Sequence, residues 1–134
     1  MKKDMKYWLK LALKYYEKAS IVKEESEKDL KIGAWNKAVS VSYFMLEMLA
    51  NALFALKKQK TTRFMGRVSL IKQLLGKDIA SEFLLIHAKR EKADHKEKIF
   101  SKEEALEIFN KAIKFYHMLK NLVEKELEKV KNLP

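Results

Sequence analysis

The sequence predicts an all-α protein, an antiparallel up-and-down bundle of four long helices and one short helix. Only three glycines and one proline, the last residue, are available for the turns that a sheet requires. Apolar residues instead recur at steps of three and four along most of the chain, which is the spacing of one face of a helix. A length of 134 residues with 48% hydrophobic content favours one folded domain, residues 1–134.

The first two helices are predicted from their apolar stripes. The first is expected from about Asp4 to Lys28, with Asp4 as its N-cap. Gly33 then suits a reversal of the chain, because glycine has no Cβ to clash at positive φ. The second helix is expected from about Ala34 to Lys58. Its apolar stripe is so broad that we expect this helix at the centre of the bundle.

The middle of the chain is more polar. Residues 57–67, KKQKTTRFMGR, are expected to form a loop, and a short helix follows from about Val68 to Leu75. Gly76 is expected to end that helix. Asp78 is the expected N-cap of the fourth helix, which runs toward Arg90.

A capping box predicts the start of the fifth helix. In SKEE, residues 101–104, the Ser101 hydroxyl would accept a hydrogen bond from an orphan amide while Glu104 reaches back. The preceding segment, about 94–100, can then be a loop. The apolar stripes of the second and fifth helices are wider than one small bundle needs, so we expect a homodimer. His117 lies within the stripe of the fifth helix and is expected to be a partly buried packing residue.

Charge and composition limit the class of function. The 29 Lys and Arg against 18 Asp and Glu give a net charge of +11. This excess attracts anions, so nucleic acid, an acidic protein and an anionic membrane all remain as partners. The chain contains no cysteine for disulfide or thiolate chemistry, which agrees with a cytoplasmic location. The three histidines show no metal-ligand spacing and there is no Gly-rich phosphate loop, so no cofactor is expected.

Membrane insertion is not expected. The longest apolar stretch, YFMLEMLANALFAL at residues 43–56, contains Glu47 and Asn51 and is shorter than the roughly 20 residues that span a bilayer. Near the N-terminus, Lys10 and Lys14 interrupt the apolar run, which argues against a signal peptide. The same stretch is basic, amphipathic and aromatic, so binding to a membrane surface is an alternative, although bundle helices share this pattern.

The stretch KREKADHKEK, residues 89–98, holds the strongest candidate for chemistry. It contains Arg90 and His95, and side chains five residues apart on a continuous helix point about 140° apart. The pair can work together only if the helix ends or bends between them, or if a second subunit completes the site. The plain alternative is a solvated helix end, because chance alone produces this spacing readily.

Two stretches carry a resemblance to a known family. They are GAWNKAVSVSYFMLEMLANALFAL at residues 33–56 and REKADHKEKIFSKEEALEIFNKAIKF at residues 90–115. In this order they resemble the HEPN family of small helical-bundle proteins from bacteria and archaea, and the resemblance covers most of the chain. It implies a dimeric, HEPN-like bundle. It also implies a metal-independent, toxin-like ribonuclease with an Arg-x4–6-His motif near the dimer interface, and a minimal nucleotidyltransferase as antitoxin or partner.

The resemblance implies that Arg90 and His95 are the catalytic residues of an endoribonuclease. Near neutral pH an imidazole can take a proton from a ribose 2′-OH or protonate the leaving oxygen. A guanidinium can clamp the phosphate oxygens on which charge builds up. Relatives with an Ala-Asp-Tyr version of the motif have Tyr at the position of His95, and many of them lack the nuclease histidine. The alternative is therefore a non-catalytic subunit that binds a nucleotide or scaffolds the nucleotidyltransferase.

Charged residues near these positions are candidates for substrate binding. A base could stack on Phe64 while the flanking cations hold phosphates, or Phe64 could instead anchor this segment in the core. Asp94 shares a helix face with His87 and Arg90, where it would orient the guanidinium or form a plain surface pair with it. The predicted substrate-binding residues are Arg63, Arg67, Lys92, Lys96 and Asp94.

Overall fold

The computed structural model describes residues 2–133, and these residues form five helices and no strand. The helices are α1 (Lys3–Lys31), α2 (Trp35–Leu56), α3 (Phe64–Leu75), α4 (Lys77–Asp94) and α5 (Lys102–Lys131). The predicted all-α class and the predicted number of helices are confirmed.

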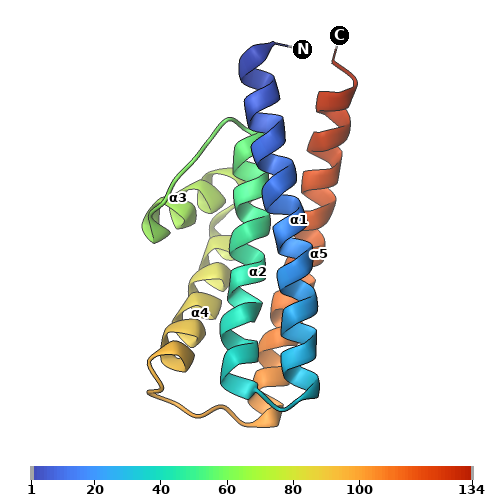
Figure 1. Ribbon diagram of the computed structural model, residues 1–134. Coiled ribbons are helices and arrows are strands. Elements are labelled where there is room, and N and C mark those ends of the chain that lie inside the picture. Colours follow the sequence, from blue (N-terminus) through green and yellow to red (C-terminus); the bar gives the residue numbers. More distant parts are fainter. Residues whose placement is uncertain (1, 134) are drawn as a thin grey trace.

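Helix α2 lies at the centre of the bundle. It packs against α1, α4 and α5, and α3 lies beside α4 (Figure 1). Met45, Leu46 and Leu49 of α2 are completely buried, as the breadth of its apolar stripe predicted. The α1–α2 turn and the α4–α5 loop lie at one end of the bundle, and both chain termini lie at the other end (Figure 1).

Two predicted N-caps are wrong. The N-cap of α1 is Lys2, and Asp4 lies in the first turn, where its Oδ2 accepts a hydrogen bond from Lys58 Nζ at 3.1 Å. The N-cap of α4 is Gly76, so Asp78 also lies inside the first turn. Both carboxylates therefore act at the positive end of a helix dipole rather than as side-chain caps.

The predicted loop at residues 57–67 is too long, because α3 already begins at Phe64. Phe64 is half-buried, and its ring lies against the rings of Tyr43 and Phe83. Burial of this aromatic side chain outweighs the polar composition of the segment around it. Gly76 ends α3 with φ +97°, as predicted.

The C-terminal part of α4 has few apolar residues, so the sequence gives no clear sign of where this helix ends. In the structure it continues past Arg90 to Asp94. Residues 95–101 then connect it to α5. The side chain of Asn36, on α2, holds this connection through three hydrogen bonds. Its Nδ2 donates to the carbonyls of Ala93 (3.3 Å) and Lys98 (2.9 Å), and its Oδ1 accepts from the Phe100 amide (2.8 Å).

The predicted capping box at the start of α5 is confirmed. The Glu104 amide donates to Ser101 Oγ at 3.2 Å, and the Ser101 amide donates to Glu104 Oε1 at 3.1 Å. Lys98 Nζ lies 2.7 Å from the other oxygen, Glu104 Oε2. The Lys98 ammonium and the Ser101 amide together lower the pKa of Glu104 from 4.5 to about 2.

This pKa shift predicts how the stability of the α5 start depends on pH. Because the folded pKa lies below the unfolded one, the stabilisation is present above about pH 4.5 and is lost as the pH falls through about 2. We expect Glu104→Gln to melt below the wild type at pH 7 and the two melting temperatures to converge toward pH 2. Thermal unfolding followed by circular dichroism measures this gap. Glu103→Gln, in the same helical turn, is the control, and a gap that stays constant with pH would contradict the prediction.

Helix α2 is the one helix within residues 2–133 that is long and apolar enough to cross a membrane. It has 22 residues, so the argument from the shorter stretch at 43–56 is wrong about length. Of its most apolar window, 78% is buried inside the bundle. Burial against three neighbouring helices accounts for this composition.

Candidate functional site

The two predicted catalytic residues lie at the C-terminal end of α4. The helix stays regular past Arg90 and ends at Asp94, so His95 is its C-cap, and the His95 amide still donates to the Glu91 carbonyl at 3.1 Å. The two side chains consequently have different partners. Arg90 Nε donates to Asp94 Oδ2 at 3.1 Å, whereas His95 Nε2 lies 3.2 Å from Glu91 Oε2. The His95 side chain is 65% exposed, and that of Arg90 is 29% exposed.

Glu47, on α2, joins two of the predicted arginines. Its Oε2 lies 3.6 Å from Arg90 Nη1, and its Oε1 lies 3.8 Å from Arg67 Nη2. Arg67 Nε also donates to Asn51 Oδ1 at 3.3 Å. The side chain of Glu47 is only 14% exposed. Three helices therefore meet at a single carboxylate that water reaches poorly.

Tyr43 forms the floor of this cluster. The Arg90 guanidinium lies over its ring, 5.0 Å from the centroid. The residue is fully buried, and its hydroxyl has no hydrogen-bond partner among the described residues. Burial, together with the nearby Glu47 carboxylate, raises the pKa of Tyr43 far above its ordinary value. The phenol is therefore a neutral hydrogen-bond donor at any physiological pH.

His87 lies beside the cluster, on the same helix as Arg90. Its ring stacks on Phe64 with 3.6 Å between centroids, and its Nε2 lies 3.4 Å from Glu91 Oε1. Burial lowers the pKa of His87, so the ring is mainly neutral at pH 7. Phe64 is thus held in the anchoring arrangement that was the alternative to base stacking.

Of the predicted site residues, the structure brings together Arg67, Arg90 and Asp94. Arg63 is exposed at the N-cap of α3, and Lys92 and Lys96 are exposed near the end of α4, with Lys96 in a left-handed conformation at φ +54°. None of these three cations forms an ion pair within residues 2–133. The prediction for His117 is wrong, because its side chain is exposed on α5 next to the buried Tyr116.

Sequence reasoning missed Glu47, Tyr43 and Asn36 as parts of this region. A signal was available for Glu47, since a carboxylate inside an apolar helical run is rarely buried without a cationic partner. Asn36 fixes the backbone on both sides of His95, because it bonds the carbonyl of Ala93 and two groups of the 98–100 segment. It therefore positions the loop on which the exposed imidazole sits.

Two pockets lie near this end of the bundle, and neither is lined by Arg90 or His95. One, of about 420 Å³, lies between the α1–α2 turn and the 96–100 loop, with Trp35 and Ile99 in its wall. The other, of about 220 Å³, lies between α4 and α5 and is lined by Leu85 and Phe100 among others. Within residues 2–133 no group of three or more His, Asp or Glu side chains is placed to hold a metal ion.

Comparison with known proteins adds no assignment to this geometry. No protein-family model matches the chain, and no curated protein matches it in sequence.

Proposed function

We propose that this protein is a HEPN-type RNA-binding protein that cleaves RNA as a homodimer, without a metal ion. Arg90 and His95 are its catalytic residues, and its cytoplasmic partner is a minimal nucleotidyltransferase that acts as antitoxin. The single observation that carries the proposal is that Arg67, from α3, and Arg90, from the helix capped by His95, converge on Glu47 of α2. Two cations that are separated in the sequence thereby lie together, and one of them is on the helix whose C-cap is the exposed His95.

The placement of the two stretches that resemble the family supports the proposal. Asn36 belongs to the first stretch, and its three hydrogen bonds are all made to residues 93–100 of the second. An antiparallel, HEPN-like bundle agrees with the tight turn at Gly33 and with the packing of α1, α4 and α5 around α2. The two stretches therefore form one continuous region of the molecule, as a shared site requires.

The proposed chemistry uses the side chains as follows. The imidazole of His95 accepts the proton of a ribose 2′-OH, and the 2′ oxygen attacks the adjacent phosphorus. The bond to the 5′ oxygen breaks, and the His95 of the second subunit, in its protonated form, donates a proton to that oxygen. Arg90 stabilises the charge on the phosphate oxygens. A guanidinium has five N–H donors, so Arg90 can bind a phosphate while it keeps contacts with Glu47 and Asp94.

Cleavage of RNA in EDTA tests this function. We expect purified protein to cut a labelled single-stranded RNA in EDTA, and both Arg90→Ala and His95→Ala to abolish cutting. Size-exclusion chromatography with light scattering checks that the variants keep the oligomeric state of the wild type. Activity that persists in both variants would come from a contaminating nuclease and would overturn the assignment.

A second candidate is a non-catalytic subunit that binds a nucleotide or scaffolds the nucleotidyltransferase. Two observations favour this function. Arg90 already forms ion pairs with the carboxylates of Glu47 and Asp94, and it shares no partner with His95, which contacts Glu91. Absence of cutting together with saturable binding of a nucleotide, measured by calorimetry, would support it. Loss of that binding in Arg90→Ala would place the nucleotide at the Glu47 cluster.

A further inference from the structure

The net positive charge of this protein is concentrated in two short segments. Residues 2–14 contain five lysines and one aspartate, and residues 57–67 contain three lysines, two arginines and no acidic residue. Together these segments contribute +9 of the formal charge of +11. The remaining residues, with 19 basic and 17 acidic side chains, are nearly neutral.

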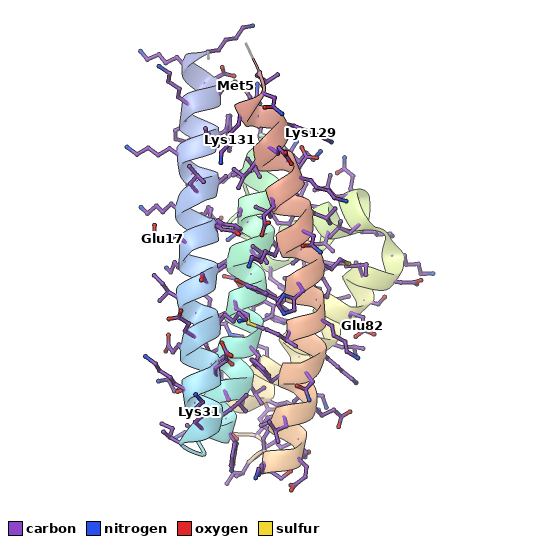
Figure 2. All side chains as sticks on the ribbon, turned by 90° about the vertical axis from the view of Figure 1, so that its right-hand side faces the viewer. Met5, Glu17, Lys31, Glu82, Lys129 and Lys131 are labelled. Atoms are coloured by element: carbon purple, nitrogen blue, oxygen red, sulfur yellow. The ribbon has the colours of Figure 1, made fainter. Side chains whose placement is uncertain are left out.

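The fold places these two segments side by side. Lys58 Nζ lies 3.1 Å from Asp4 Oδ2, and residues 59–61 line a small pocket together with Leu11 and Tyr15 of α1. We call the surface formed by residues 2–14 and 57–63 the basic end. It lies at the end of the bundle where the chain begins and finishes, away from the α4–α5 loop that carries His95 (Figure 1). Figure 2 shows Met5 at this end, near Lys129 and Lys131, and Lys31 at the opposite end.

Much of this charge has no acidic partner. Lys6, Lys10 and Lys14 are exposed and form no ion pair within residues 2–133. They are four residues apart, so they follow one another along the outer side of α1 at intervals of about 6 Å. Lys60 and Arg63 are also exposed, and they too form no ion pair within residues 2–133. The result is a row of cations whose field is not cancelled locally.

The remaining side of α1 is not available to lipid. A helix that lies on a membrane must present a free apolar face to the acyl chains. In this protein Ala12 and Ala19 are fully buried against the bundle, and Trp8 and Leu9 are half-buried on the same side. Tyr7 and Leu13 are also exposed on this part of α1, but they are six residues apart and so point about 120° apart around the helix, and they form no single apolar face. The exposed surface is therefore dominated by the lysine row, which fits the evenly charged backbone of a nucleic acid better than a lipid bilayer.

We propose that the basic end is a second RNA-binding surface, which holds the phosphate backbone of single-stranded RNA without regard to sequence. It is separate from the Arg90–His95 site, and the choice of RNA as the polyanion rests on the proposed function. RNA that contacts both regions extends over the length of the bundle. α2 alone, with its 22 residues, is about 33 Å long.

The test compares two triple variants of the full chain. The first is Lys6→Gln, Lys10→Gln and Lys14→Gln. The matched control is Lys28→Gln, Lys31→Gln and Lys114→Gln, which removes the same charge from exposed lysines outside the basic end. Fluorescence anisotropy of a labelled 20-nucleotide oligouridine is measured against salt concentration for both, and circular dichroism verifies the helical content.

The first variant is expected to bind the RNA at least roughly tenfold more weakly at 50 mM salt. Its plot of log affinity against log salt becomes less steep by about 2, since each lost phosphate contact on a single strand removes about 0.7. The control keeps the slope of the wild type. Equal weakening in both variants, or no change in the first, overturns the proposal. The proposal is also overturned if the first variant keeps its affinity for oligouridine but loses binding to phosphatidylserine vesicles. The basic end would then be a membrane-binding surface.

The same assay separates this inference from the proposed function. If Arg90→Ala and His95→Ala retain the wild-type salt slope, the basic end binds RNA independently of any cleavage. If the RNA assay shows the predicted loss in the lysine variant but no variant or wild type cuts RNA, the nuclease proposal fails and the RNA-binding surface stands.

Discussion

Replacing His95 with glutamine is expected to lower the rate constant of RNA cleavage at pH 7 by about 10²–10⁴-fold, the usual contribution of a general acid or base. Glutamine keeps a polar side chain of similar length but cannot accept and release a proton. The effect on folding should be small, because the His95 side chain is 65% exposed and contacts only Glu91 among the described acidic groups. Single-turnover cleavage of labelled RNA in EDTA measures the rate constant.

His87→Gln is the matched control for this experiment. Both imidazoles contact the Glu91 carboxylate, at 3.4 Å for His87 and 3.2 Å for His95. His87 is half-buried under Phe64, and burial lowers its pKa, so it is a poor proton carrier for a substrate at the surface. We expect the control to cleave at nearly the wild-type rate. Equal losses in both variants would show that Glu91, not the His95 imidazole, matters for cleavage.

The helices of this protein could be predicted because their signals are local. The apolar spacing of α2 and the capping box at Ser101 depend only on neighbouring residues, and both predictions are confirmed. The start of α3 was mispredicted for the opposite reason. Residues 57–67 are polar as a group, but Phe64 packs against rings that come from α2 and α4. Tertiary burial of one side chain decided where the helix begins.

The candidate site was predictable only in part, because it depends on which helix faces meet. The Arg90–Asp94 pair follows from a spacing of four within one helix and was expected. The convergence of Arg67 and Arg90 on Glu47 joins three helices, and no periodicity in a single sequence specifies it. Glu47 was considered only as an obstacle to membrane insertion. Its position in an apolar helix instead reflects two cations that reach it from α3 and α4.

Replacing Glu47 with glutamine is expected to lower the free energy of unfolding by about 2 kcal/mol. Removing one partner of a fully buried ion pair costs roughly 3–5 kcal/mol, and partial exposure of the three side chains reduces this value. The side chains of Glu47, Arg67 and Arg90 are 14%, 13% and 29% exposed. Urea unfolding followed by circular dichroism measures the change. Glu17→Gln, an exposed carboxylate of α1 without an ion pair within residues 2–133, should change stability by less than about 0.5 kcal/mol.

The same substitution separates a structural role for Glu47 from its effect on RNA. In Glu47→Gln, Arg67 and Arg90 lose the carboxylate that they share, so more of their charge is available to a phosphate. We therefore expect a less stable protein that binds oligouridine more tightly than the wild type at equal salt. A carboxylate that only held the fold together would give lower stability and unchanged or weaker binding. Unchanged stability would contradict the ion-pair assignment itself, because two arginines of low exposure cannot lose their common partner without cost.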